Sequence, residues 1–181
     1  MTKVSYKDAD KKKAVRQFLF SHYKNSKIVG LAGPDINDYI KWCKDNGFEV
    51  DEVWERDPRV MMRQLTDLKH DLSFKYRFGD IDNTDPNKDN TVYDLDYCGS
   101  MKTLFKSVMK FKKTAVITFS LRGYGTEKTL KDFFRSRKEK VIDQTTKMKP
   151  MKHIVITTTE GKYIATPYFD TTPMLSIAKI S

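Results

Sequence analysis

Short runs of β-branched and apolar residues alternate with amphipathic stretches along most of this chain. Five runs predict strands: Lys27–Leu31, Phe48–Trp54, Ser73–Phe78, Thr91–Leu95 and Thr114–Ser120. Helices are predicted between them, with Asp35 as an N-cap, Gly47 just after a helix end and Pro58 in a first turn. Strands that alternate with helices pair in parallel and are covered on both faces, so the pattern predicts an α/β domain.

The two ends of the chain extend this pattern. Residues 8–24 predict a basic N-terminal helix, and Thr126–Val141 predicts a long helix. The basic surface of the long helix is expected to carry Lys131, Arg135, Arg137, Lys138 and Lys140. Lys152–Thr158 and Tyr163–Pro167, joined by a glycine turn, predict an antiparallel hairpin. We therefore expect a single domain over residues 1–181, a three-layer sandwich around a mostly parallel seven-stranded sheet that ends in this hairpin.

Charge is spread unevenly along the chain, whose net charge is +10. Residues 1–27 carry 8 basic and 2 acidic side chains, residues 28–100 carry 9 and 16, and residues 101–152 carry 15 and 4. Basic segments attract polyanions, whereas an acidic middle disfavours a phosphate-rich ligand there. Excess lysine that serves only solubility is the alternative.

Cysteine content and hydropathy argue against a disulfide-rich, metal-binding, secreted or membrane-spanning protein. Cys43 and Cys98 have no paired metal-ligand spacing, so we expect neither a disulfide framework nor a metal site. The charged N-terminus lacks the apolar stretch of a signal peptide, and no run is long enough to span a membrane. These features predict a protein of a reducing cytoplasm.

Four predicted strand ends carry small or acidic residues. The first strand runs into a turn with Gly30, Ala32 and Gly33, where backbone N–H groups can approach a ligand. Glu55 follows the second strand, before the helix at Pro58. The third strand leads to Gly79-Asp80-Ile81-Asp82, and the fourth to Tyr93-Asp94-Leu95-Asp96-Tyr97. Ligands of parallel sheets bind at such carboxyl ends.

Together these segments resemble the motifs of the class I S-adenosylmethionine-dependent methyltransferases, over residues 27–170. The resemblance implies a Rossmann-like fold and S-adenosylmethionine as cofactor. It places the amino-acid portion of the cofactor near Gly30, Ala32 and Gly33, the ribose at Glu55 and the adenine at Asp80 and Ile81. Asp94 would border the cofactor. The residues alone leave open that Glu55 neutralises Arg56 and that Asp80 belongs to an ordinary turn.

The fourth segment resembles the Asp/Asn-Pro-Pro-aromatic motif of nucleic-acid amino-methyltransferases and the Asp-Leu-Asp-Pro-Phe-Gly-Ser motif of tRNA guanine-N2 methyltransferases. The resemblance implies catalytic roles for Asp94, Asp96 and Tyr97, although Leu95 and Asp96 stand where the first motif has prolines, and Tyr97 where the second has one. A helix cap with a structural tyrosine is the alternative.

Several basic and aromatic residues are candidates for contact with a nucleic acid. They lie in the first helix, in the glycine-flanked loop after the fifth strand and in the long basic helix: Lys12, Lys13, Arg16, Arg122, Tyr124, Arg135 and Lys138. Solvated helix faces with extended lysines are the alternative.

We therefore expect a methyltransferase acting on DNA or RNA. Because no separate recognition domain is evident, it would need a partner subunit for target recognition or would recognise only local shape. A non-catalytic nucleic-acid- or protein-binding module with the same fold is the main alternative, and an enzyme that consumes the cofactor alone is a third. The small size and high lysine content would suit a viral protein in a host cytoplasm.

Overall fold

The computed structural model describes residues 6–24, 27–69, 73–97, 99–169 and 172–180. The chain divides into two compact units. Lys24–Leu95 form the first, here the central unit, and Met1–Tyr23 together with Asp96–Ser181 form the second, the terminal unit. Each unit has strands and helices of its own.

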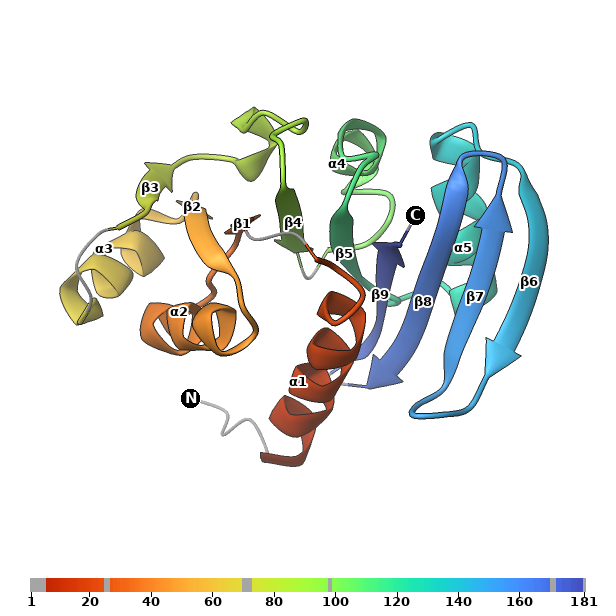
Figure 1. Cartoon of the computed structure of the whole chain (residues 1–181), viewed down its shortest axis with the longest axis horizontal. Helices are drawn as coiled ribbons and strands as arrows, with labels where there is room; N and C mark the ends of the chain where they lie inside the picture. The colour runs from red at the N-terminus through yellow and green to blue at the C-terminus, as the bar shows by residue number, and fades with distance from the viewer. Residues whose placement is uncertain (1–5, 25–26, 70–72, 98, 170–171, 181) are drawn as a thin grey trace. The chain divides into compact units, whose positions relative to one another are not determined.

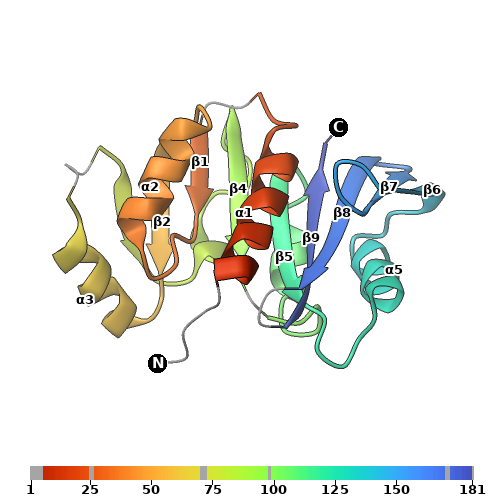
Figure 2. The ribbon, with the colours of Figure 1, turned by 90° about the horizontal axis from the view of Figure 1, so that it is seen from below.

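The central unit is a parallel α/β structure (Figure 1). Its elements are β1 (Lys27–Gly30), α2 (Ile36–Asp45), β2 (Glu49–Glu55), α3 (Pro58–Asp67), β3 (Lys75–Phe78), the 3-10 helix η1 (Ile81–Asn83) and β4 (Thr91–Asp96), whose last residue belongs to the terminal unit. The strands follow the order β3-β2-β1-β4, and all three pairings are parallel. Helices α2 and α3 pack against β2 and against each other (Figure 2).

Local capping residues set the helix bounds of the central unit. Asp35 accepts a hydrogen bond from the Asp38 backbone N–H at 3.0 Å and so caps α2. Gly47 follows α2 with a φ of +80°, the left-handed conformation that ends many helices. Pro58 opens α3 behind the N-cap Asp57. The sequence-based predictions of these three helix ends are confirmed.

The terminal unit holds an antiparallel sheet. Its elements are α1 (Tyr6–Phe20), α4 (Phe105–Lys110), β5 (Ala115–Ser120), α5 (Thr126–Ser136), β6 (Val141–Lys147), β7 (His153–Thr158), β8 (Gly161–Phe169) and β9 (Pro173–Lys179). The strand order is β5-β9-β8-β7-β6, and each neighbouring pair is antiparallel. The predicted hairpin corresponds to β7 and β8.

Helices cover both faces of this antiparallel sheet. Tyr163 of β8 packs edge-on against Phe133 and Phe134 of α5, with ring centroids 6.0 and 5.1 Å apart. Tyr168 lies five residues further along β8, so its side chain points to the opposite face. There it lies near Lys12 and Arg16 of α1. The terminal unit is therefore a layered α/β structure.

The prediction of a mostly parallel seven-stranded sheet is wrong in strand number and direction. The described residues form nine strands, four in parallel and five in antiparallel pairing. The sequence-based prediction did not include β6 and β9. It ran the long helix into β6, whereas α5 ends at Ser136 and Lys138 adopts a φ of +56°. The left-handed residue that ends a helix is usually glycine, so a lysine there gives no signal in the sequence.

Candidate functional site

The carboxyl ends of the four parallel strands bring the predicted cofactor residues to one edge of the central unit. The register pairs Gly30 of β1 with Asp94 of β4 and Glu55 of β2 with Phe78 of β3. The Gly79 backbone N–H donates to the Glu55 carbonyl at 2.8 Å, which leads the chain from β3 directly into Asp80. Parallel strands end at a common edge, where open α/β sheets bind ligands.

The turn after β1 is fixed by a buried glutamine. Gln64 of α3 is fully buried; its side-chain amide donates to the Gly33 carbonyl and accepts from the Tyr76 hydroxyl of β3. Gly33 has a φ of +70°, and no described atom beyond Gly33 and its two chain neighbours lies within 4 Å of where a β-carbon would stand. The turn is thus held on its inner side and open on its outer side.

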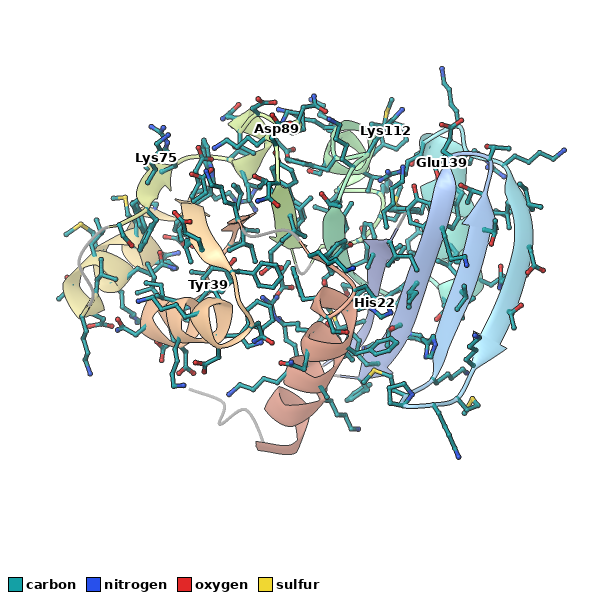
Figure 3. All side chains as sticks on the ribbon, viewed as in Figure 1. His22, Tyr39, Lys75, Asp89, Lys112 and Glu139 are labelled. Atoms are coloured by element: carbon teal, nitrogen blue, oxygen red, sulfur yellow. The ribbon has the colours of Figure 1, made fainter. Side chains whose placement is uncertain are left out.

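Gly30 has a different environment. A β-carbon at this position would overlap the Tyr39 hydroxyl of α2 and would stand 3.0 Å from the Asp94 β-carbon. Tyr39 is buried, and its side chain extends from α2 toward the strands (Figure 3). The small size of Gly30 therefore allows close packing with Tyr39. The sequence-based prediction gave Gly30 a role in cofactor binding and did not include this packing.

Glu55 presents a partly engaged carboxylate at the end of β2. Its Oε1 accepts hydrogen bonds from the backbone N–H groups of Arg56 and Asp57, at 2.9 and 2.8 Å. Within the described chain both bonds go to this one oxygen, and the side chain is half-buried. Burial, with a contribution from the charge of Glu55, raises the pKa of Tyr76 to about 12. Glu55 is oriented by the backbone, which leaves Oε2 available as an acceptor.

Asp80 and Ile81 lie together after β3. Asp80 is exposed and caps η1, because its Oδ1 accepts from the Asp82 N–H at 3.0 Å. Ile81 is buried. The exposed Asp80 carboxylate can accept a hydrogen bond from a ligand, whereas the Ile81 side chain packs in the core.

A buried ionic network holds the segment after η1. Glu52 of β2 accepts from the Trp54 indole at 2.8 Å, the Thr84 hydroxyl at 2.7 Å and the Lys88 ammonium at 2.7 Å. Lys88 also binds Asp51 at 2.7 Å. Burial raises the pKa of Glu52, but the bonds from Lys88, Thr84 and Trp54 outweigh it and hold this pKa below its ordinary value. The network fixes the path from β3 to β4.

The three predicted catalytic residues fall into different units. Asp94 is 1% exposed and belongs to the central unit, whereas Asp96 and Tyr97 belong to the terminal unit. Asp96 forms an ion pair with Lys12 of α1 at 2.5 Å. Lys12 was predicted to contact nucleic acid, so part of its charge is already engaged within the terminal unit.

This chain resembles known proteins in its fold rather than in its sequence. No protein-family model and no curated protein matches the sequence significantly. Solved structures match at low identity. The N-methyltransferase NodS from Bradyrhizobium japonicum WM9 has a TM-score of 0.56 at 11% identity, and the match covers 97% of both chains. The 23S rRNA methyltransferase ErmE has a TM-score of 0.55 at 12% identity, over 93% of this chain and 67% of that one.

A third match is an rRNA methylase from Streptococcus thermophilus, with a TM-score of 0.52 at 14% identity over 96% of this chain and 97% of that one. The chain has a Rossmann-like methyltransferase fold. In this methyltransferase fold, all seven residues predicted to bind the cofactor lie in the central unit: Gly30, Ala32, Gly33, Glu55, Asp80, Ile81 and Asp94.

The residues predicted to contact nucleic acid all lie in the terminal unit. Lys13, Arg122, Arg135 and Lys138 are exposed. Tyr124 is half-buried with the Lys128 ammonium 4.4 Å from its ring centroid, and the Arg16 guanidinium lies 5.4 Å from the Phe20 ring centroid. The terminal unit has 23 basic and 9 acidic side chains, the central unit 11 and 15. Charge is thus divided between the units of the methyltransferase fold.

Arg137 does not belong to the basic surface on which the sequence had suggested it. It is 3% exposed and donates to Glu139 at 3.1 Å and to the Phe111 carbonyl at 2.8 Å. The sequence-based predictions also gave no role in this site to Tyr39, Gln64 or Tyr76. Tyr39 lies on the apolar face of α2 and could have been expected in the core, whereas nothing in the sequence distinguishes Gln64 from an exposed glutamine.

The described residues fall short of what metal sites and membrane-spanning helices require. Among the residues described, no three histidine, cysteine, aspartate or glutamate side chains form a group suited to a metal ion. Cys43 is buried and forms no disulfide with a described residue, and Cys98 lies outside the described residues. No helix in the described ranges has both the length and the apolar character needed to cross a bilayer.

Proposed function

We propose that this chain is an S-adenosylmethionine-dependent methyltransferase that acts on nucleic acid. The observation that carries the proposal is the convergence of the Gly33 turn, Glu55, Asp80 and Asp94 at the carboxyl edge of the parallel strands. The methyltransferase fold supports it, because ligands of open α/β sheets bind at this edge.

The residues at this edge suit the parts of the cofactor. Oε2 of Glu55 would accept hydrogen bonds from the ribose hydroxyls, since Oε1 already binds two backbone N–H groups. The open side of Gly33 would admit the amino-acid portion. Asp80 would accept a hydrogen bond from the adenine amino group, and the adenine would lie along the backbone at Ile81, whose side chain is buried in the core. The Tyr39 hydroxyl occupies the space beside Gly30, so Gly33 rather than Gly30 would provide the close approach.

The protein needs little acid-base chemistry in this reaction. The bound cofactor supplies a methyl group already activated by its sulfonium. Asp94, which the register places opposite Gly30, would accept a hydrogen bond from the target amine and orient it. Within the terminal unit, we assign Asp96 to the orientation of Lys12, its ion-pair partner, and Tyr97 to stacking on a base of the nucleic acid.

Nucleic acid is the substrate that the charge distribution favours. The terminal unit carries a net charge of +14, and the central unit a net charge of −4. A polyanion is attracted to the terminal unit, while the central unit suits the cationic cofactor. Two of the similar structures, ErmE and the Streptococcus thermophilus methylase, are described as rRNA methyltransferases. We propose that a partner subunit supplies the selection of the target.

Calorimetric titration with S-adenosylmethionine tests the cofactor site. We expect binding by the wild-type protein and a loss of about tenfold or more in Glu55→Gln, which removes the charged acceptor. Glu49→Gln, at the exposed start of the same strand, is the matched control and should bind normally. Wild-type protein that releases no heat and gains no thermal stability from the cofactor would refute the proposal.

A non-catalytic binding module is the second candidate. Two observations favour it: Tyr39 fills the space beside Gly30, and Asp94 is almost fully buried. Incubation of the protein with RNA, DNA and cofactor labelled in the methyl group separates the two candidates. Label in the nucleic acid supports the enzyme, and cofactor binding without transfer to either polymer supports the module.

A further inference from the structure

The helix α4 presents a face that combines apolar and cationic side chains. Phe105 is 48% exposed and Met109 is 39% exposed, and Lys106 and Lys110 are exposed beside them. Residues four apart lie on one side of a helix, so Phe105 and Met109 adjoin each other, with Lys106 and Lys110 alongside. Lys102 precedes this face and Lys113 follows it. These six residues are called the α4 surface.

The opposite side of α4 is firmly anchored. Leu104, Ser107, Val108 and Phe111 are buried. The Arg137 guanidinium, itself buried, donates through Nη1 to the carbonyls of Val108 at 3.3 Å and Phe111 at 2.8 Å. A cation at these carbonyls provides hydrogen-bond donors for the acceptors at the carboxyl end of the helix and interacts favourably with the helix dipole. The orientation of α4 is therefore fixed, and the α4 surface is a stable outward face.

The segment around α4 has a strongly one-sided charge. Residues 99–114 contain five lysines and neither aspartate nor glutamate. Figure 3 labels one of them, Lys112, whose backbone carbonyl accepts a hydrogen bond from Lys179 at 3.1 Å. Positive charge of this density attracts a polyanion and binds it more weakly as salt concentration rises.

We propose that the α4 surface binds single-stranded nucleic acid, with its lysines along the phosphates and the Phe105 ring stacked on an unpaired base. An exposed phenyl ring among lysines offers both contacts that sequence-independent single-strand binding uses. A duplex keeps its bases stacked inside and would gain only the lysine contacts. A helix of six residues buries too little apolar area to lie stably in a membrane surface.

This proposal rests on the proposed function for its choice of polymer, but it concerns a different surface. None of its residues was among those predicted to bind cofactor or nucleic acid. Its test is made without cofactor, so a failure of oligonucleotide binding and a failure of S-adenosylmethionine binding are separate results.

The test is fluorescence anisotropy of the full-length protein with labelled RNA and DNA oligonucleotides of about 12 nucleotides, single-stranded and duplex. We expect Phe105→Ala to weaken single-strand binding about tenfold with the salt dependence unchanged. Lys102→Gln with Lys106→Gln should lower the slope of log affinity against log salt concentration by about 1.4. Preference for RNA or for DNA identifies the natural polymer, and either result supports the proposal.

Matched controls change the same chemistry elsewhere. Phe169→Ala removes another exposed phenyl ring, 53% exposed on β8, and Lys44→Gln with Lys75→Gln removes two exposed lysines of the central unit. Both controls should bind like the wild type. Equal losses in the controls, equal affinity for duplex and single strand, or binding only to vesicles that contain phosphatidylserine would overturn the proposal.

Discussion

Tyr39 of α2 places its hydroxyl oxygen so close to Gly30 of β1 that a β-carbon at Gly30 would overlap it. Gly30→Ala should therefore lower the free energy of unfolding by about 2 kcal/mol, because the added methyl group forces Tyr39 or Asp94 to move. Tyr39→Phe removes the clashing oxygen, so the two changes should not be additive. Urea unfolding of both single variants and the double variant should give a coupling energy of about 1 kcal/mol in favour of the double variant.

Gly33 serves as the control, because its surroundings differ. Gly33→Ala meets no atom of the described chain but places alanine at a φ of +70°, which costs about 1 kcal/mol. This cost should be the same in the wild-type protein and in the Tyr39→Phe variant. If Gly30→Ala left stability unchanged and reduced only cofactor affinity, the packing role of Gly30 would be wrong.

Gln64 gives a second prediction, on the turn after β1. Gln64→Leu leaves the Gly33 carbonyl and the Tyr76 hydroxyl without their partner, and we expect a loss of about 2 kcal/mol in the free energy of unfolding. Gln64→Glu keeps the acceptor for Tyr76 but replaces the amide donor to Gly33 by a carboxylate oxygen. Its destabilisation should therefore shrink at acidic pH, where a protonated carboxyl can donate. Destabilisation of Gln64→Glu that is equal at pH 5 and pH 8 would contradict the assigned geometry.

The central unit could largely be predicted from the sequence, because its signals are local. Asp35, Gly47 and the Asp57-Pro58 pair mark helix ends through bonds to residues close by in the chain. The strand ends that carry Glu55 and Asp80 follow from the same alternation. The contacts of Gln64 with Gly33, 31 residues away, depend on the packing of α3 and leave no trace in the pattern.

The terminal unit was less predictable. The end of α5 uses a left-handed Lys138 where a glycine would have been recognised, so the predicted helix was extended to Val141, the first residue of β6, and the strand itself was missed. Every residue of β6 is exposed, and such a strand lacks the alternation of buried and exposed positions that identifies a half-buried one. Arg137 was read as a surface residue because only its tertiary contacts show that it is buried.

The ion pair of Glu52 with Lys88 predicts a pH dependence. Because the pKa of Glu52 is lower in the folded protein than its ordinary value of 4.5, the carboxylate stabilises the fold above about pH 4.5, and this contribution is lost as the pH falls further. Glu52→Gln should lower the free energy of unfolding by about 2 kcal/mol at pH 7, since hydrogen bonds to a charged group are lost. Between pH 5 and pH 3, its stability should fall less steeply than that of the wild type. A variant curve parallel to that of the wild type through this range would show that another group controls acid unfolding.

Arg137 joins α4 to the rest of the terminal unit, which gives a prediction that local stability can test. Its guanidinium donates to Glu139, and its Nη1 donates to the carbonyls of Val108 in α4 and of Phe111, the C-cap of this helix. Arg137→Met removes these bonds and leaves the Glu139 carboxylate buried without its cation, so the free energy of unfolding should fall by about 3–5 kcal/mol. Tyr163 and Thr158 still donate to Glu139 at 2.7 and 3.1 Å, so the side chain stays in place but loses its charge partner.

The neighbouring arginine provides the control for this prediction. Arg135→Met changes an exposed side chain two residues earlier and should alter stability by less than about 0.5 kcal/mol. Amide hydrogen exchange should be accelerated throughout α4 in Arg137→Met and unchanged in Arg135→Met, because only Arg137 binds the carbonyl end of that helix. Arg137→Lys keeps the charge but cannot reproduce the planar fork of donors, so its stability should lie between those of the wild type and Arg137→Met. If α4 kept its protection in Arg137→Met, the helix would be held by its buried face alone, and the orientation of Phe105 would not depend on the guanidinium.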